Sequence, residues 1–502
     1  MLYTPPTGRF KDNCVFWHEG EYYLFSMYEH GGENYRSVWL ARSGDGVHWR
    51  DVGPVIDRAE FLVWAMAVHR VGDRFILNHG SFTTPDLQNV LRLWESRDLV
   101  HWTYMGAAHD VMPDERWYDR RSRLDCMNVI RVEAAEGQRY YGYATGPGGF
   151  LESADGIHWS GMPRPVTEWG DVPPPPTPED EGGFEVGGCC DLDGRYYLLG
   201  GWFNYMGAFG YGVYTLVADT PTGPFRPDAA AYRLCGNSER WVSLWARPCR
   251  TPAALLISSY MYDGYSYETG QTWLPPLKMA RADAGGHLRL AYWHGNEALK
   301  GPSQPLDPDS LTQVHSTVAA ACHIEAGDRG VDLVAGPEQP SFDRPGVPAV
   351  IALAPAGLDF ARGVVIEGTV EATCDDRRLV APEVGFVLAD HDRQGTALLL
   401  EAAGRTRIGR LRWSAQFDFA SEDVIGPGCA SPMGIAPHRP HRFRLLVRRN
   451  MFEFYLDDLH VQTYNTTSER GTTGPVPATW GLLARNGRGI FRDISIAPMT
   501  LG

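Results

Sequence analysis

The nine cysteines of this sequence follow no pattern typical of metal sites or disulfide frameworks. Two of them, Cys189 and Cys190, are adjacent, but there is no Cys-x-x-Cys pair and no Cys/His spacing of the zinc-binding kind. We therefore expect reduced thiols, as in a cytoplasmic protein, with no bound metal and no cofactor.

Long apolar runs and an excess of positive charge are also missing. No stretch approaches the roughly 20 apolar residues that cross a membrane, and residues 1–6 (MLYTPP) do not resemble a secretion signal. Asp and Glu (61) outnumber Lys and Arg (46), which leaves a net charge of −15. Because nucleic acids and anionic membranes attract basic proteins, we expect neither as a partner. A neutral substrate fits better, and a homo-oligomer is left open.

Turn-forming and aromatic residues, in contrast, are abundant. The 56 Gly and 36 Pro among 502 residues favour β architecture over helix bundles, and the length allows two or more domains. The 16 Trp and 23 Tyr suit surfaces that stack on sugar rings.

A short motif occurs three times in the first third of the chain. It consists of residues 43–49 (SGDGVHW), 96–102 (SRDLVHW) and 153–159 (SADGIHW). The tryptophans lie 53 and 57 residues apart, and each copy follows an apolar strand. A strand, a tight turn and an aromatic strand predict a hairpin. The turn is expected to be structural, with its His and Trp packed between neighbouring units.

A second repeat precedes the first in each unit. It consists of residues 19–25, 71–77, 136–143 and 193–199, with a weaker fifth copy at 251–257. Five units of roughly 50–60 residues, each about four strands long, are typical of a β-propeller. We therefore predict an all-β protein with a five-bladed β-propeller over residues 1–300.

The repeat ends after Trp293. Residues 301–345 are rich in Pro, Gly, Asp and Ser and are predicted to form a linker. Alternating strands resume with a different rhythm, for example at 363–372 and 443–456. Residues 346–502 are therefore predicted to form a β-sandwich of the concanavalin or lectin-like kind, either as a buttress or as a sugar-binding domain.

Three of the five inner strands are expected to begin with an acid. Asp12 lies ten residues before Tyr22, Glu185 eleven before Tyr196, and Asp125 just before the strand that starts at Met127. A propeller gathers its inner strands around one axis, so these acids should converge on one pocket. Each acid alone is more readily explained as a solvated strand-end carboxylate. Three at equivalent positions fit glycoside hydrolysis, which needs a protonated acid and an ionised carboxylate.

These residues also carry a family resemblance. Residues 12–16 (DNCVF) followed by 20–25 (GEYYLF) resemble the opening motif of the five-bladed propeller glycosidases, families 32, 43, 62 and 68. Residues 184–197 resemble their general-acid strand, and residues 123–125 (RLD) resemble the Arg-Asp-Pro motif of family 32. A C-terminal sandwich is also similar to the family 32 layout.

The family 32 resemblance implies a role for each acid. Asp12 would be the nucleophile, Glu185 the acid/base and Asp125 the transition-state stabiliser. The sequence departs from the family after Asp12, within the Arg-Asp pair and after Glu185, which points to a divergent subgroup. The substrate-binding residues expected around the acids are Trp64, Asn13, Arg123, Trp17 and Trp202.

Three functions remain open on the sequence. The first is a retaining exo-acting furanosidase that cleaves β-fructofuranosides or a related furanoside. The second is an inverting arabinofuranosidase or xylosidase of the family 43 kind, with Asp12 as the general base and the option of a calcium ion on the propeller axis. The third is a propeller that binds carbohydrate without cleaving it.

Overall fold

The fold is taken from a computed structural model of the chain. The structure describes residues 1–30, 33–57, 59–83, 88–119, 123–134, 137–145, 149–175, 185–205, 209–265, 270–316, 322–327, 329–336, 347–373, 381–391, 393–402, 404–414, 416–466 and 474–501. No helix in these ranges is long and apolar enough to span a membrane.

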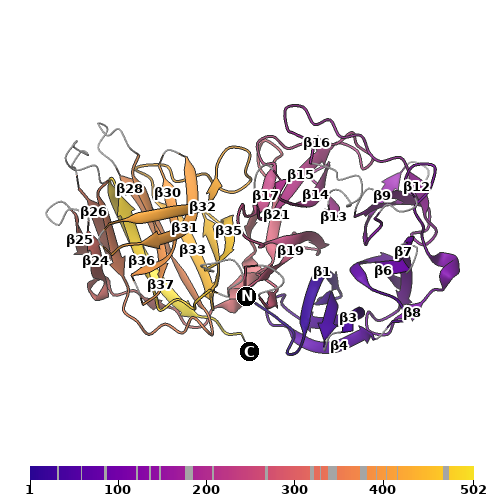
Figure 1. The fold of residues 1–502 in the computed structure, drawn as a ribbon, viewed down its shortest axis with the longest axis horizontal. Helices are drawn as coiled ribbons and strands as arrows, with labels where there is room; N and C mark the ends of the chain where they lie inside the picture. Colours follow the sequence, from indigo (N-terminus) through magenta and orange to yellow (C-terminus); the bar gives the residue numbers. More distant parts are fainter. Residues whose placement is uncertain are drawn as a thin grey trace.

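Five antiparallel blades stand around a common centre, as the sequence repeats predict (Figure 1), and the fifth blade continues into one sandwich sheet where Ala291 pairs with Leu459. The first two blades are β1 (Arg9–His18), β2 (Glu21–His30), β3 (Glu33–Ser43) and β4 (Arg50–Ile56), then β5 (Trp64–Val71), β6 (Arg74–Thr83), β7 (Gln88–Ser96) and β8 (Thr103–Tyr104). The third is β9 (Met127–Ala134), β10 (Gly137–Ala144), β11 (Phe150–Ser153) and β12 (Ser160–Met162). In each blade the first strand in the chain lies innermost.

The last two blades carry an extra short strand each. The fourth contains β13 (Glu185–Leu192), β14 (Arg195–Phe203), β15 (Tyr211–Ala218), β16 (Arg226–Pro227) and β17 (Arg233–Gly236). The fifth contains β18 (Leu244–Arg250), β19 (Leu255–Tyr262), β20 (Thr272–Trp273), β21 (Lys278–Ala282) and β22 (Leu288–Tyr292). Leu2 donates to Leu274 and Tyr3 accepts from it, both at 2.8 Å, so the start of the chain closes the ring on the fifth blade.

The remaining strands form two facing sheets beside the propeller (Figure 1). One contains β35 (Leu459–Asn465), β34 (Met451–Leu456), β33 (His441–Arg448), β28 (Val364–Thr373), β37 (Arg488–Pro498), β26 (Gly330–Ala335) and β25 (Cys322–Gly327), with β23 (Gln304–Pro305) on β37. The other contains β24 (Thr312–Ser316), β27 (Ala349–Leu353), β36 (Thr479–Arg485), β29 (Glu383–Ala389), β30 (Gln394–Glu401), β31 (Arg405–Arg412) and β32 (Asp418–Ile425). The all-β class and the propeller-plus-sandwich arrangement are confirmed.

The segment predicted as a linker, residues 301–345, contributes strands to both sandwich sheets, namely β23, β24, β25 and β26. Three short 3-10 helices complete the described elements, η1 (Ala107–His109), η3 (His294–Leu299) and η4 (Pro308–Ser310).

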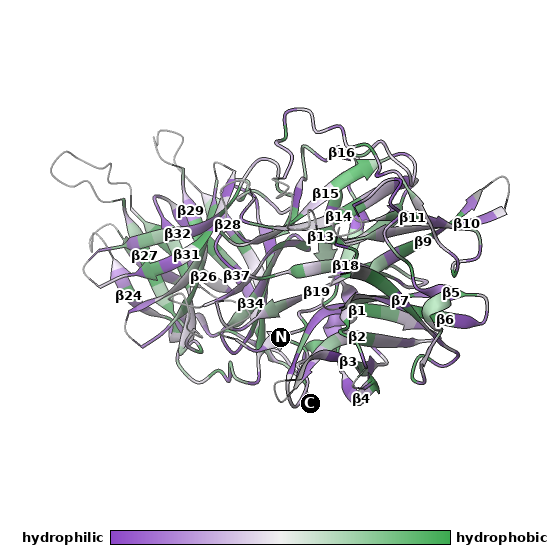
Figure 2. Ribbon diagram, turned by 45° about the vertical axis from the view of Figure 1, so that its right-hand side comes forward, coloured by the Kyte–Doolittle hydropathy of each residue, from purple (hydrophilic) through white to green (hydrophobic). Residues whose placement is uncertain are grey.

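Apolar side chains of the inner and middle strands fill the propeller, and a second core fills the space between the sandwich sheets. Figure 2 shows hydrophobic residues concentrated along the strands of both units. The repeated turn behaves as predicted for its Trp residues, of which Trp49 and Trp102 pack on the main propeller core. The prediction was wrong for the histidines. His48, His101 and His158 are exposed and turn back to the Asp three residues earlier, at 2.6–2.7 Å.

Candidate active site

The inner strands are interrupted at the end where the acids lie. The pairing of β1 with β2 shifts between Lys11 and Cys14, and Asp12 adopts φ 46°. The corresponding shifts in the second and fifth blades include Ala65 (φ 34°) and Trp245 (φ 56°). A bulge re-aims a side chain, and a positive φ in a residue other than glycine is costly and concentrates at functional sites. The same bulge with a positive φ therefore occurs in three blades, and in the first blade the residue at this position is the acid Asp12.

Asp12 lies deep in the ring but keeps part of its surface accessible. Tyr260 of β19 donates its hydroxyl to Asp12 Oδ1 at 2.9 Å. Burial, followed by the negative charge of Glu185, raises the pKa of Asp12 to about 6, and the Tyr260 hydrogen bond works in the opposite direction. Asp12 is therefore ionised above about pH 6 and sits within electrostatic reach of Glu185.

Glu185 is the first residue of β13. Tyr211 of β15 donates its hydroxyl to Glu185 Oε2 at 3.1 Å, and Arg123 Nη1 lies 3.3 Å from Glu185 Oε1. The side chain of Glu185 is 21% exposed, so one donor holds each oxygen while the carboxyl group stays reachable.

Asp125 precedes β9 and is 1% exposed. Its Oδ2 lies 2.5 Å from Arg123 Nε, so this one guanidinium bridges two of the three acids. Burial works against the charge of Arg123, but the carboxylates of Asp125 and Glu185 raise its pKa above the usual value. Asp125 Oδ1 is buried and has no hydrogen-bond partner among the described residues. A buried acceptor without a partner is rare.

The structure brings two further predicted residues close to Asp12. Asn13 is fully buried and donates through Nδ2 to the Ser259 carbonyl at 3.2 Å, which leaves its Oδ1 without a partner in the described part of the chain. Trp64 begins β5, and its ring lies 5.5 Å from that of Tyr35. Tyr35 accepts a hydrogen bond from Lys11, the neighbour of Asp12.

The other two predicted tryptophans are placed differently. Trp17 lies five residues along β1 from Asp12, opposite Tyr22 next to the turn, and packs against the propeller core. Trp202 is 9% exposed, and its ring lies 6.3 Å from that of Tyr205 in the core shared by the third and fourth blades. The structure thus links Asp12, Glu185, Arg123 and Asp125 by contact or charge, places Trp64 near Asp12 through Tyr35 and Lys11, and leaves Trp17 and Trp202 in packing environments.

Sequence reasoning missed three residues that shape this site. Tyr260 holds Asp12 from β19, the second strand of the fifth blade, and Tyr211 holds Glu185 from β15, the third strand of the fourth blade. Gly80 lies against Asp125, because a Cβ on Gly80 would fall 2.7 Å from Asp125 Oδ1 and 2.8 Å from its Cα. No motif marks these positions.

Within the described residues, no group of three or more His, Cys, Asp or Glu side chains is arranged to hold a metal ion. A pocket of about 450 Å³ lies away from the acids, between the fifth blade and the sandwich, and Arg281, Asp283, Arg289 and Ser431 are among its lining residues. The carboxylate cluster itself offers Asp12, which is ionised above about pH 6, and the carboxyl group of Glu185, whose side chain is 21% exposed.

No protein-family model matches the sequence. No curated protein matches it either. The fold, however, is similar to solved structures along its whole length. An exo-inulinase from Aspergillus awamori superposes with a TM-score of 0.65 at 13% identity, over 100% of this chain and 97% of that one. A family GH32 beta-fructofuranosidase from Bombyx mori gives 0.63 at 12% identity, over 99% and 92%. Fructan 1-exohydrolase IIa from Cichorium intybus gives 0.63 at 12% identity, over 99% and 96%. The chain therefore has the fold of the family 32 glycosidases.

Proposed function

We propose that this protein is a glycoside hydrolase, a retaining exo-acting furanosidase that cleaves β-fructofuranosides or a related furanoside. The observation that carries the proposal is the continuous cluster of Tyr260, Asp12, Glu185, Arg123 and Asp125 at one end of the propeller axis. The fold supports it, because solved relatives in fold include the Bombyx mori enzyme in complex with sucrose and the Cichorium intybus enzyme in complex with 1-kestose.

In the first step an oxygen of ionised Asp12 attacks the anomeric carbon while the bond to the leaving oxygen breaks. Glu185 gives its carboxyl proton to that oxygen, so the aglycone leaves as an alcohol and the sugar remains esterified to Asp12. In the second step Glu185 takes a proton from water, the water oxygen attacks the anomeric carbon, and the ester to Asp12 breaks.

The surrounding residues fit these steps. Arg123 offsets the charge of buried Asp125, and the Tyr260 hydroxyl favours the ionised form of Asp12. Asp125 offers its free Oδ1 to a sugar hydroxyl, a contact that strengthens as positive charge develops on the ring. Trp64 and Asn13 are proposed to line the same sugar site.

The first test is turnover of sucrose, 1-kestose, inulin and aryl arabinofuranosides or xylosides. We expect Asp12→Asn and Glu185→Gln each to lower kcat/KM by about 10²–10⁴-fold on the active substrate. Glu152→Gln removes a carboxylate that pairs with Arg139 in the third blade and should leave turnover unchanged. A wild-type protein that binds sugars but cleaves no glycoside would instead favour the carbohydrate-binding function.

The second test is the stereochemistry of transfer to methanol, followed by NMR of the methyl glycoside at early times. Retention of the anomeric configuration supports a covalent intermediate on Asp12. Inversion would contradict that role and would make Asp12 the base of an inverting arabinofuranosidase or xylosidase.

A further inference from the structure

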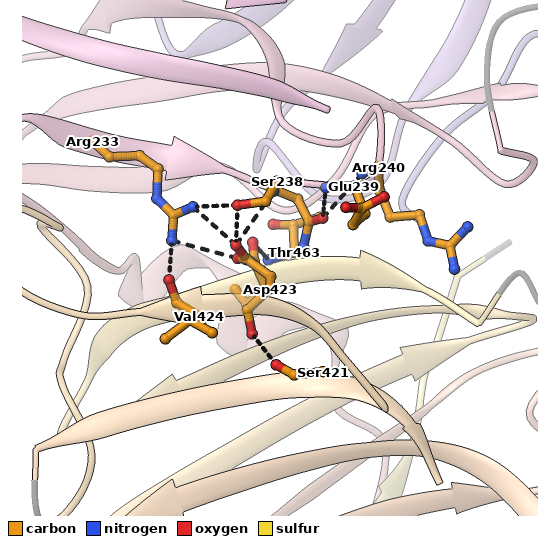
Figure 3. Close-up of polar contacts among 10 residues, drawn as sticks. Arg233, Ser238, Glu239, Arg240, Ser421, Asp423, Val424 and Thr463 are labelled. Atoms are coloured by element: carbon orange, nitrogen blue, oxygen red, sulfur yellow. Dashed lines mark hydrogen bonds and ion pairs between the residues drawn. The ribbon is translucent and has the colours of Figure 1, made fainter. Parts of the chain in front are cut away.

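Asp423 belongs to β32 of the sandwich, yet two of its partners, Arg233 and Ser238, are residues of the propeller (Figure 3). It is 2% exposed. Its Oδ1 accepts from Ser238 Oγ at 2.7 Å and from Arg233 Nη1 at 2.9 Å. Its Oδ2 accepts from Gln462 Nε2 at 2.7 Å, a contact within the sandwich. Each carboxylate oxygen is therefore occupied, and the charge is matched by Arg233, whose side chain is 16% exposed.

Glu422, the preceding residue, makes a second contact with the same propeller segment. Arg240 Nη2 lies 2.8 Å from Glu422 Oε2, and Tyr464 donates its hydroxyl to the same carboxylate. The guanidinium of Arg240, which is itself 2% exposed, also lies 4.9 Å from the centre of the Tyr265 ring. Two consecutive sandwich acids thus hold propeller residues 238 and 240.

Residues 237–240 of this segment hydrogen-bond to the backbone of Gly210 and Tyr211. Gly210 donates to the Ser238 carbonyl at 2.7 Å, and Tyr211 donates to the Arg240 carbonyl at 3.2 Å. In return, the Asn237 amide donates to the Tyr211 carbonyl at 3.0 Å. Because hydrogen bonds run in both directions, residues 210 and 211 cannot shift without moving 237–240.

Tyr211 then reaches the proposed general acid, since its hydroxyl donates to Glu185 Oε2 at 3.1 Å. We propose that Asp423 and Glu422 are positioning residues of the active site, which set the Tyr211–Glu185 hydrogen bond through residues 237–240. The sandwich thereby supports catalysis in the propeller. This inference rests on the proposed function, in which Glu185 carries the proton.

The physical reason is the sensitivity of proton transfer to geometry. A donor held at hydrogen-bond distance favours the ionised form of a carboxylate, and its loss favours the protonated form. A misplacement of about 1 Å lowers the rate by as much as 10²-fold. A buried ion pair has few alternative arrangements, so it transmits position well.

The test compares Asp423→Asn and Glu422→Gln with Glu453→Gln. Glu453 is the matched control, because it is a buried sandwich acid paired with Lys278 of the fifth blade at 2.5 Å and does not contact residues 237–240. We expect Asp423→Asn and Glu422→Gln to lower kcat about 10-fold with KM within about 2-fold. The alkaline limb of the kcat/KM profile should move to higher pH. Glu453→Gln should lower the Tm and leave both kinetic readouts unchanged.

A double variant separates positioning from general destabilisation. Tyr211→Phe should itself lower kcat and shift the alkaline limb in the same direction. Adding Asp423→Asn to Tyr211→Phe should then change neither further, because the contact through which Asp423 acts is already gone. Additive effects, or an Asp423→Asn variant that matches Glu453→Gln, would overturn the proposal.

Failure of the proposed function is separable from failure of this inference. The Glu185 carboxyl carbon can be followed by NMR in ¹³C-labelled protein and assigned by its loss in Glu185→Gln. If the wild type cleaves no glycoside but Asp423→Asn shifts the titration of that signal, the positioning contact stands and the reaction is wrong. An unshifted titration overturns the positioning role, whatever the activity.

Discussion

At the scale of single residues, Asp12 combines an unusual backbone with an unusual acidity. Its φ of 46° lies within a bulge, and burial together with the charge of Glu185 raises its pKa to about 6. Both features distinguish Asp12 from an ordinary strand-end carboxylate, which would lie in a regular strand and would be exposed to water. The protein stabilises the ionised form with Tyr260 rather than with solvent.

Tyr260→Phe should move the acid limb of the kcat/KM profile to higher pH. Activity requires ionised Asp12, so it falls as the pH drops through about 6. The Tyr260 hydrogen bond lowers the pKa of Asp12, and its removal raises that pKa further. Tyr197→Phe, which removes a hydroxyl bonded to the Gly286 carbonyl at 2.8 Å, is the control and should leave the limb in place. A shift of the limb to lower pH in Tyr260→Phe would contradict the assignment.

Gly80→Ala should lower kcat/KM by about 10–100-fold with little change in the KM of the substrate. The added Cβ would fall 2.7 Å from Asp125 Oδ1 and 2.8 Å from its Cα, so Asp125 has to move away from the sugar site. Gly44→Ala has no heavy atom within 4 Å of the new Cβ and should leave steady-state kinetics unchanged. Wild-type kinetics in Gly80→Ala would show that Asp125 does not act in the reaction.

At the scale of elements, the repeated turn explains why the motif recurs without being a site. Asp45 Oδ1 accepts from the amides of Val47 and His48 at 2.9 and 2.8 Å, and Asp45 Oδ2 lies 2.7 Å from the His48 ring. In the third copy, Ile157 packs with Ile76 and Leu93 of the second blade. The polar residues therefore close the turn, and the apolar residue next to them joins neighbouring blades.

Asp45→Ala should lower the free energy of unfolding at pH 7 by about 1 kcal/mol, since two turn amides lose their acceptor. Burial raises the pKa of Asp45, but its hydrogen bonds, above all from His48, outweigh this and lower the pKa to about 2. A depressed pKa in the folded state stabilises the fold above about pH 4, and this contribution is lost toward about pH 2. The difference from the wild type in urea unfolding should therefore shrink over that window. Asp57→Ala, an exposed control, should show no such pH dependence.

At the scale of the whole molecule, the sandwich and the propeller meet through buried charges. Lys278 and Glu453 are 2% and 0% exposed and pair at 2.5 Å, while Tyr455 and Thr463 donate to the same carboxylate at 2.6 and 2.8 Å. Such pairs are strongly directional, so they define how the two units sit against each other more than they add to stability.

Lys278→Met should destabilise the protein by about 3–5 kcal/mol, because it leaves Glu453 charged and buried without its cation. Lys278→Met combined with Glu453→Gln should recover most of the loss, since the amide is neutral, its oxygen still accepts from one of the Tyr455 and Thr463 hydroxyls, and its NH2 group can donate to the other. Chemical unfolding of the three variants measures both effects. A double variant no more stable than Lys278→Met would show that the charge itself is not the cause.

The sequence alone determined the parts of this protein that are local. Five repeats predicted the propeller, because each blade consists of about 50–60 consecutive residues. Asp12, Asp125 and Glu185 were identifiable because each lies at the start of an inner strand, which is a short-range position. The alternation after residue 346 likewise indicated a sandwich.

Only the tertiary structure decided which residues complete the site. Tyr260 holds Asp12 across 248 residues, and Asp423 holds Ser238 across 185, so no spacing in the sequence connects them. Whether a tryptophan such as Trp202 lines a pocket or a core likewise depends on how neighbouring blades pack. The acids are positioned by hairpins, and the local sequence around each acid is sufficient to predict its hairpin. Their partners follow from ring closure and from the docking of the sandwich, which involve the whole chain at once.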